Sequence, residues 1–489
     1  MQFQKKDIAC LRQLTSQVLN QEQTLTLRLD DSLPKLGRVI GAWGQALLRG
    51  KEWRNGSVVI TGGVIAWVLY VPEDGSACQS VEGWLPFQWK VDIPPTQYDG
   101  TVIANLLLRS IDARVLADQK LMLRDNVGLQ LKVWVPDQTQ IYEPEEVPED
   151  LQILQKSCRI RIPAEAGEKS FAVEEILEYP ANASQPEKLL FYRLQPELIE
   201  QKMMADKVVF RGILILHTVY LGRDGRLHTW DFEVPYAQFG ELEGQYSEEA
   251  SAGIRIAVTA VDVKETEKGL QLTGSMTGQY VIYEKPDIQL VTDAYSTKRQ
   301  TDLQMETVSL PSVCAIQTQS IPCQMQLQTQ ARSVVDTQFM PEHPCSARNE
   351  DGPFVELGGQ FRMLWENEEG QPELTIGDWN HRVQRPECAS MEAAVTVTGI
   401  EQATLDGTVQ ADLLLNTVDF EDGYLDAVSA VEFGQELDTQ ERPSLILRRA
   451  DGADLWSIAK ETGSTVAAIL AANGLEGEPE PNRMLIIPM

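Results

Sequence analysis

The chain has 489 residues, too many for one hydrophobic core, and about 150 residues per domain predicts roughly three domains. Its hydrophobic share of 43% and charged share of 23% are typical of globular proteins and exclude a mainly disordered chain. Asp and Glu number 72 against 42 Lys and Arg, and the resulting net charge of −30 argues against nucleic acid or anionic lipid as a partner.

Cysteine and histidine usage argues against disulfides and metal sites. The seven cysteines are scattered and never spaced as CxxC, which is typical of a reducing compartment. His217 and His228 are expected on the two strands of one hairpin and not in a metal site. Residues 1–21 lack the apolar stretch of a secretory signal, and apolar runs such as 62–71 are too short to span a bilayer. We therefore expect a cytoplasmic protein with no membrane span.

The first 21 residues are predicted to form an amphipathic helix. Ile8, Leu11, Leu14 and Val18 recur at spacings of three and four, and Asp7 is available as an N-cap. The apolar stripe of such a helix would pack against the domain that follows.

An internal repeat dominates the middle of the chain. Gly62 and Gly212 each follow a run of β-branched and aromatic residues, and in both copies a turn glycine comes thirteen residues later. A third copy, one residue shorter, surrounds Gly358. Each turn is followed by another strand, with Trp89 in the first copy and Trp230 in the second. The three glycines are predicted to be structurally equivalent, and so are the two tryptophans.

The fold prediction is a mainly β protein with three tandem β-sandwich-like repeats, over residues 22–146, 147–293 and 294–438. Acidic, proline-containing stretches such as 143–150 are expected to link them.

Residues 443–489 show a different pattern, a small β-α-α-β unit. Helical spacing stops at Gly463, resumes after a Ser-Thr cap and ends again at Gly474. Short strands are predicted on either side, over 444–448 and 484–487.

No motif of catalysis is present. The chain has no P-loop, no GxGxxG after a strand, no GxSxG and no HExxH, and its carboxylates are too numerous to single out an acid–base pair. We expect a protein that is not an enzyme and that needs no cofactor.

The C-terminal unit resembles a LysM domain. Its residues 452–459, Gly-Ala-Asp-Leu-Trp-Ser-Ile-Ala, are similar to the opening motif of that family, and 481–488, Pro-Asn-Arg-Met-Leu-Ile-Ile-Pro, to its closing motif. Thr465-Val466 and Asn473-Gly474-Leu475 match the middle. LysM domains bind N-acetylglucosamine-containing glycans between the loop after the first strand and the loop after the second helix. The resemblance implies a groove formed by these loops: Asp451, Gly452, Ala453, Asp454, Leu455, Ala472, Asn473, Gly474, Leu475 and Glu476. Arg448 and Arg449 stand where the family usually has an apolar residue, and in a chain of net charge −30 this basic edge is a candidate docking patch.

Three β repeats followed by a LysM unit resemble the SPOCS-domain spore coat proteins of clostridial sporulators. The resemblance implies a structural protein of spore coat or envelope assembly, located in the mother-cell cytoplasm at the forespore surface. Its LysM domain would dock a coat morphogenetic protein, a SpoIVA-like ATPase. The alternative is a peptidoglycan-binding protein that recognises N-acetylglucosamine glycan. A hydrolase with a LysM anchor would need a catalytic domain, for which the repeats offer no motif.

Overall fold

The structure, a computed structural model, describes residues 1–489 except 55, 118 and 438–442. The chain is mainly β, as predicted, with two short helices near its C-terminus that are followed by a strand. No helix within the described residues is long and apolar enough to cross a membrane. The predicted boundary between the third repeat and the C-terminal unit falls on 438–442, outside the described residues.

The strands fall into three segments. Segment 1 (residues 4–143) contains β1 (Gln4–Arg28), β2 (Leu36–Arg54), β3 (Ser57–Pro72), β4 (Gln79–Asp92), β5 (Thr101–Ala117) and β6 (Lys120–Glu143). Segment 2 (151–296) contains β7 (Leu151–Arg159), β8 (Ile162–Leu177), β9 (Pro186–Met204), β10 (Lys207–Gly222), β11 (Leu227–Glu241), β12 (Ser251–Thr266), β13 (Gly269–Glu284) and β14 (Asp287–Ser296). Segment 3 (299–436) contains β15 (Arg299–Gln326), β16 (Ser333–Pro341), β17 (Cys345–Asn349), β18 (Gly352–Glu366), β19 (Pro372–Gln384), β20 (Ser390–Ala403) and β21 (Thr408–Glu436).

One strand order recurs in all three segments. The first sheet has the orders β1-β6-β5, β8-β13-β12 and β15-β21-β20, and the second has the orders β2-β3-β4, β9-β10-β11 and β16/β17-β18-β19. All the pairs are antiparallel. The two sheets of a segment share one apolar core. In segment 1, for example, Val58 and Val64 of β3 belong to the same buried cluster as Leu121 and Leu129 of β6.

The predicted N-terminal helix is wrong, because residues 4–28 form β1, which pairs along its whole length with β6. A shift in the pairing register between Gln13 and Thr15 explains the misleading spacing. Such a bulge moves the inward face from one set of alternate residues to the other. Cys10 lies inward before the bulge, whereas Leu19 lies inward after it and Val18 is exposed. The apolar residues spaced three and four apart therefore do not share one face, since Leu11 is buried and Val18 is exposed.

The repeated glycines are held by one close backbone approach. A Cβ on Gly62 would lie 2.2 Å from the carbonyl oxygen of Leu47, and a Cβ on Gly212 would lie 1.8 Å from that of Glu197. The equivalent in segment 3 is Gly359, 2.8 Å from the oxygen of Met340, and not Gly358 as predicted. Each glycine is also paired across the second sheet with an aromatic residue: Phe87, Tyr236 and Trp379.

The predicted equivalence of Trp89 and Trp230 is wrong. Trp89 pairs with Ile60, two residues before the glycine of its segment, whereas Trp230 pairs with Thr218, six residues after the glycine. The two tryptophans therefore lie at different heights in the sheet. The spacing of the motif was similar only because tryptophan is common in strands.

The three segments contact one another head to tail. In each segment the residue three positions after the repeated glycine pairs with a glutamine on the neighbouring strand: Gln45, Gln195 and Gln338. Gln45 exchanges two hydrogen bonds with the backbone of Leu194 in segment 2, of 2.7 and 2.9 Å. Gln195 donates to the carbonyl of Val397 in segment 3, at 3.1 Å.

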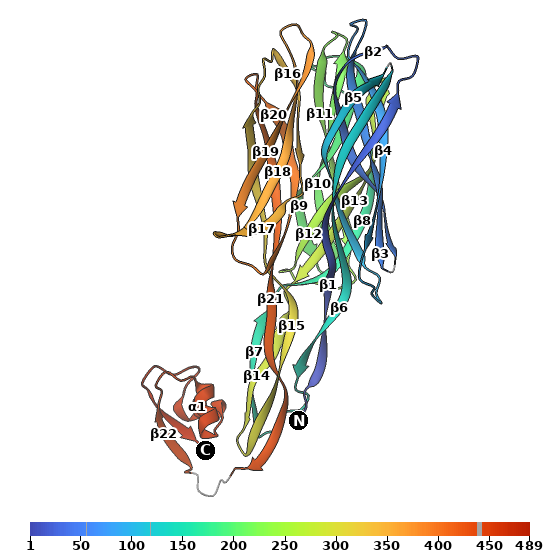
Figure 1. The fold of residues 1–489 in the computed structure, drawn as a ribbon. Coiled ribbons are helices and arrows are strands. Elements are labelled where there is room, and N and C mark those ends of the chain that lie inside the picture. The colour runs from blue at the N-terminus through green and yellow to red at the C-terminus, as the bar shows by residue number, and fades with distance from the viewer. Residues whose placement is uncertain (55, 118, 438–442) are drawn as a thin grey trace.

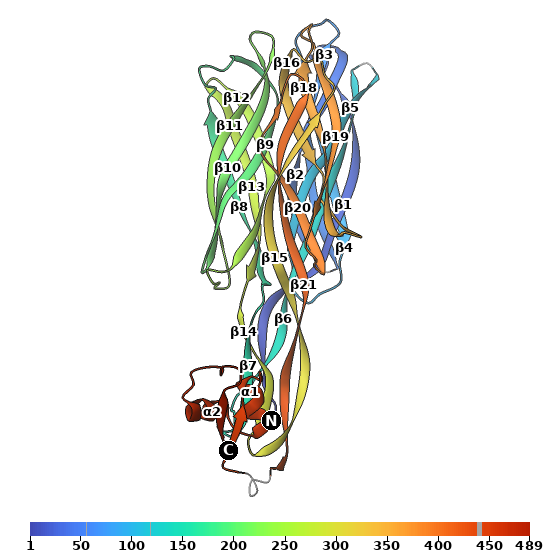
Figure 2. The same cartoon turned by 90° about the vertical axis from the view of Figure 1, so that its left-hand side faces the viewer.

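The third contact closes the ring. Arg362, which pairs with Gln338, donates from Nη1 to the carbonyl of Ile111 in segment 1, at 3.1 Å. A heterologous contact that returns to its starting copy produces cyclic symmetry, here within a single chain. Figures 1 and 2 show the three segments side by side in both views.

At one end of the molecule, extensions of the three segments together form a stalk. The ends of β1 and β6, the pair β7–β14 and the ends of β15 and β21 extend as three antiparallel ribbons (Figures 1 and 2). Side chains of all three ribbons, among them Ile141, Leu290 and Val431, belong to one buried cluster. The stalk therefore has its own core, because isolated two-stranded ribbons are marginally stable in water.

The close approach at Gly212 predicts a specific loss of stability. Gly212→Ala would force β9 away from β10, and overpacking of this kind costs about 1–3 kcal/mol of the free energy of unfolding. The matched control is Gly253→Ala at an exposed position of β12, where the nearest atom to a Cβ is 3.6 Å away. Chemical denaturation of both variants measures the effect. Equal stability of the two variants would contradict this role for the glycine.

Candidate functional sites in the C-terminal unit and between segments 2 and 3

The C-terminal unit consists of β22 (Leu445–Arg449), α1 (Leu455–Thr462), α2 (Val466–Asn473) and β23 (Met484–Pro488). The helices end at Gly463 and Gly474 as predicted, both with the positive φ that favours glycine. β22 and β23 pair antiparallel, and one face of this small sheet packs on the helices through Leu485 and Ile487.

Several of the predicted groove residues have structural contacts. Asp454 caps α1 by accepting the backbone N–H of Ser457 at 2.6 Å, and this bond lowers the pKa of Asp454. Leu455 is buried in the core. The amide side chain of Asn473 bonds both backbone groups of Ile486, at 2.6 and 2.8 Å, and so joins α2 to β23.

The other predicted residues lie at the surface of the two loops or beside them. Asp451, Gly452, Ala472, Gly474, Glu476 and Arg449 are exposed, and Ala453 and Leu475 are half-buried. Arg448 is partly covered and pairs with Glu461 of α1. Glu478, which sequence reasoning missed, joins the two loops by accepting the backbone N–H of Leu455 at 3.0 Å.

The helix α1 docks the C-terminal unit on the stalk. Trp456 donates from Nε1 to Asp293 of β14 at 2.8 Å, and Lys460 forms an ion pair with the same carboxylate at 2.6 Å. Tyr295 packs edge-on against Trp456, with ring centroids 4.9 Å apart, and donates to the carbonyl of Ser464. Burial raises the pKa of Tyr295 to about 12, so its hydroxyl keeps the proton that it donates.

Trp456 is half-buried against the core of the unit. Its polar partner, however, is 163 residues away in segment 2. Nothing in the local sequence indicates that contact.

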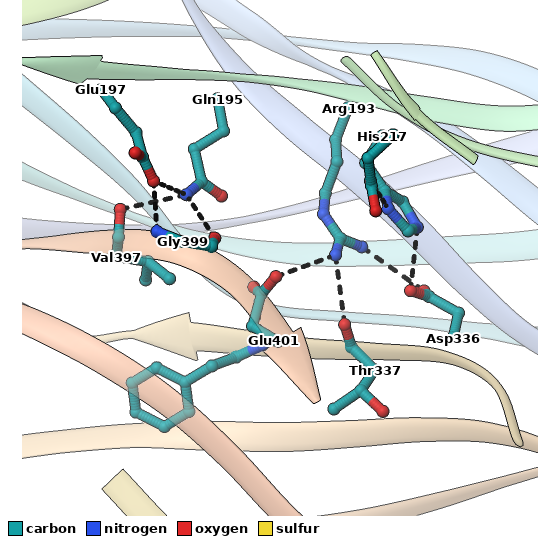
Figure 3. Close-up of polar contacts among 11 residues, drawn as sticks. Arg193, Gln195, Glu197, His217, Asp336, Thr337, Val397, Gly399 and Glu401 are labelled. Carbon is teal, nitrogen blue, oxygen red and sulfur yellow. Dashed lines mark hydrogen bonds and ion pairs between the residues drawn. The ribbon is translucent and has the colours of Figure 1, made fainter. Parts of the chain in front are cut away.

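A buried charge cluster joins segments 2 and 3 (Figure 3). Arg193 of β9 contacts Asp336 of β16 at 3.4 Å and Glu401 of β20 at 3.1 Å. His217 of β10 lies between two carboxylates, with Nδ1 2.5 Å from Asp231 and Nε2 2.9 Å from Asp336. Protonated His217 and Arg193 together carry two positive charges against three carboxylates.

The charges of this cluster raise the pKa of His217 and lower the pKa of Asp336. Burial and the Arg193 charge disfavour protonated His217, but Asp336 and Asp231 outweigh them and hold its pKa above the ordinary value. Burial alone would raise the pKa of Asp336, whereas Arg193 and His217 hold it well below the usual range. His217 and His228 do lie on the two strands of one hairpin as predicted, and His228 contacts Asp224 instead.

Asp293→Ala is expected to loosen the C-terminal unit. One charged hydrogen bond contributes about 1.5–3 kcal/mol, and each 1.4 kcal/mol is about tenfold in an equilibrium. Amide hydrogen exchange in α1 should therefore accelerate about tenfold or more. Glu480→Ala, on an exposed position of the same unit, is the control. Unchanged exchange in α1 of the Asp293 variant would show that the carboxylate does not hold the unit in place.

The charge cluster predicts a pH-dependent stability. Because the folded pKa of His217 is raised, its contribution is complete below the unfolded pKa of about 6.5 and is lost as the pH rises through the folded pKa. The destabilisation caused by His217→Gln should therefore be larger at pH 6 than at pH 9. Denaturant unfolding over that range measures it, and a cost independent of pH would contradict the charged state of His217.

Asp336→Asn tests the opposite pH dependence, a contribution to stability that is lost at low pH. The depressed pKa of Asp336 means that its contribution is present above about pH 4 and is lost as the pH falls further. Breaking a buried pair costs about 3–5 kcal/mol, so this variant should be strongly destabilised at pH 7. A stability within about 1 kcal/mol of the native chain at pH 7 would contradict the ion-pair role.

Comparison of the chain with models of protein families, with curated proteins and with solved structures finds no match.

Proposed function

We propose that this chain is a non-enzymatic interaction protein of spore coat or spore envelope assembly. In this proposal the three segments are SPOCS-like β-sandwich repeats, and residues 443–489 are a LysM domain that docks a coat morphogenetic protein. The motifs over 452–459 and 481–488 support the LysM assignment, as do helices that end where the motif predicts. The recurrent strand order supports the repeat assignment.

The observation that carries the docking proposal is an apolar sheet face. The outward face of β22 and β23 presents four exposed side chains: Leu445, Leu447, Met484 and Ile486. Leu447 is 64% exposed and lies directly opposite Ile486. Contiguous exposed apolar residues are typical of a surface that binds another protein. The docking of α1 on the stalk leaves this face uncovered at the end of the molecule.

A positive charge on the apolar face favours a partner that has acidic residues beside its own apolar surface. Arg449 is exposed on the same face and pairs in register with Met484. Complementary charge at the rim of an interface raises the association rate and fixes orientation. The partner we propose is a SpoIVA-like ATPase, in the mother-cell cytoplasm at the forespore surface. The seven cysteines are all unpaired, which supports a reducing compartment.

The contacts of the loops favour a protein partner over a glycan. Leu455 N–H is taken by Glu478, and both functional groups of the Asn473 side chain bond the backbone of Ile486. Sugar recognition depends on polar groups that converge on the ligand hydroxyls. The N–H of Leu455 and the side-chain amide of Asn473 are already bonded to other groups of the chain.

The proposal is tested with three variants of the full-length protein. Leu447→Glu and Arg449→Glu change the apolar face and its rim, and Ala453→Trp blocks the loop groove. Capture of a purified SpoIVA-like ATPase should fall about tenfold or more for Leu447→Glu, because a charge then enters an apolar interface. Ala453→Trp should leave that capture unchanged.

Sedimentation with insoluble peptidoglycan provides the second readout. We expect little sedimentation of the native chain and no dependence on Ala453→Trp. Tight peptidoglycan binding that Ala453→Trp abolishes would establish the glycan alternative instead. Normal ATPase capture by Leu447→Glu would rule out the apolar face as the docking site.

A further inference from the structure

A cavity of about 540 Å³ lies where the three segments meet. Its walls include β2 and β5 of segment 1, β9 and β12 of segment 2, and β16 and β20 of segment 3. Protein interiors are packed as densely as organic crystals, with few voids larger than a water molecule. A space of this size at the centre of a ring is within the range of small-molecule sites, about 300–1,000 Å³.

The walls combine polar residues with apolar side chains. Half-buried aliphatic side chains from all three segments line the cavity: Leu106, Leu198, Ile254, Ile256, Ile316 and Val397. Val397 takes part in the ring contacts through its backbone carbonyl, which accepts from Gln195, and not through its side chain. The partial exposure of these side chains is therefore available to an apolar ligand.

Four of the five charged residues that line the cavity form ion pairs. Lys132 pairs with Glu392, Arg193 pairs with Asp336 and Glu401, and Glu200 pairs with Arg211. Arg255 also lines the cavity, and among the described residues it has no hydrogen-bond or ion-pair partner. Among the described residues the guanidinium of Arg255 is thus the one charged group of the lining that makes no direct ion pair.

The surroundings of Arg255 make that charge costly. Burial lowers the pKa of Arg255, although the charge of Glu392 acts in the opposite direction. Glu392 is already engaged by Lys132 and by the amide of Gln13. A guanidinium presents a planar set of donors that fits a carboxylate with two parallel hydrogen bonds.

We propose that this central cavity binds a small amphiphile with an apolar body and a single anionic head group. The apolar body lies against the aliphatic walls, and the head group is held by Arg255. This site is separate from the C-terminal unit and does not depend on the function proposed for it.

Calorimetry with the full-length native chain tests the proposal. The probes are dodecanoate and dodecyltrimethylammonium, each below its critical micelle concentration, so that chain length is matched and the head charge is reversed. We expect saturable binding of one dodecanoate per chain and binding of the cation weaker by about tenfold or more, since a charge-assisted hydrogen bond contributes about 1.5–3 kcal/mol. Absence of saturable dodecanoate binding, or equal affinity for both probes, would overturn the proposal.

Two variants locate the site. Arg255→Gln should weaken dodecanoate binding about tenfold or more and leave dodecanol binding unchanged, because only the head-group contact is lost. Arg226→Gln removes an exposed arginine between β10 and β11, outside the cavity lining, and is the matched control. Val397→Phe should weaken both ligands by filling the cavity. Native dodecanoate affinity in both Arg255→Gln and Val397→Phe would place the binding elsewhere on the protein and refute the site.

Discussion

The close approach of a glycine to a neighbouring carbonyl is the constraint on which the ring depends. At Gly62, Gly212 and Gly359 the absence of a side chain lets two strands of the second sheet approach more closely than any Cβ would allow. Three positions further along these paired strands, each segment has a glutamine. In segments 1 and 2 this glutamine bonds the backbone of the next segment, and in segment 3 the arginine paired with the glutamine does so. Because the contact closes after three segments, their extended strand ends meet below the ring and form one stalk.

The three interfaces differ in chemistry. Trp43 and Trp67 in segment 1 occupy the register positions that Arg193 and His217 occupy in segment 2. Trp43 stacks on Phe191 of segment 2 and Trp67 packs at a tilt against Tyr192, whereas the arginine and histidine meet carboxylates of segment 3. Exchanging the partners would leave charges facing aromatic rings without counter-ions, which is costly in a buried interface. The order of the segments around the ring is therefore specified by the side chains as well as by the chain connections.

The stalk gives the C-terminal unit a defined position. A unit of about 45 residues buries little apolar surface of its own, and additional contacts are usually needed at that size. Tyr295 supplies such a contact, because it belongs to the buried cluster of the unit although it lies in β14. The helix face with Trp456 and Lys460 is consequently occupied, and the sheet face with Leu447 and Ile486 stays open. The interaction proposed for the protein thus depends on which face the stalk covers.

Local sequence determined much of this molecule. The β-rich character, the hairpin with His217 and His228, and the helix ends at Gly463 and Gly474 could be predicted, because turn glycines and period-2 patterns act over a few residues. The helix predicted for residues 1–21 failed since a bulge changed the phase of the alternation. Tertiary structure alone decided the equivalence of Gly359, the charge cluster and the contact between Trp456 and Asp293. These depend on strand register and on segments more than a hundred residues apart, and a one-residue shift in register reverses which face a side chain occupies.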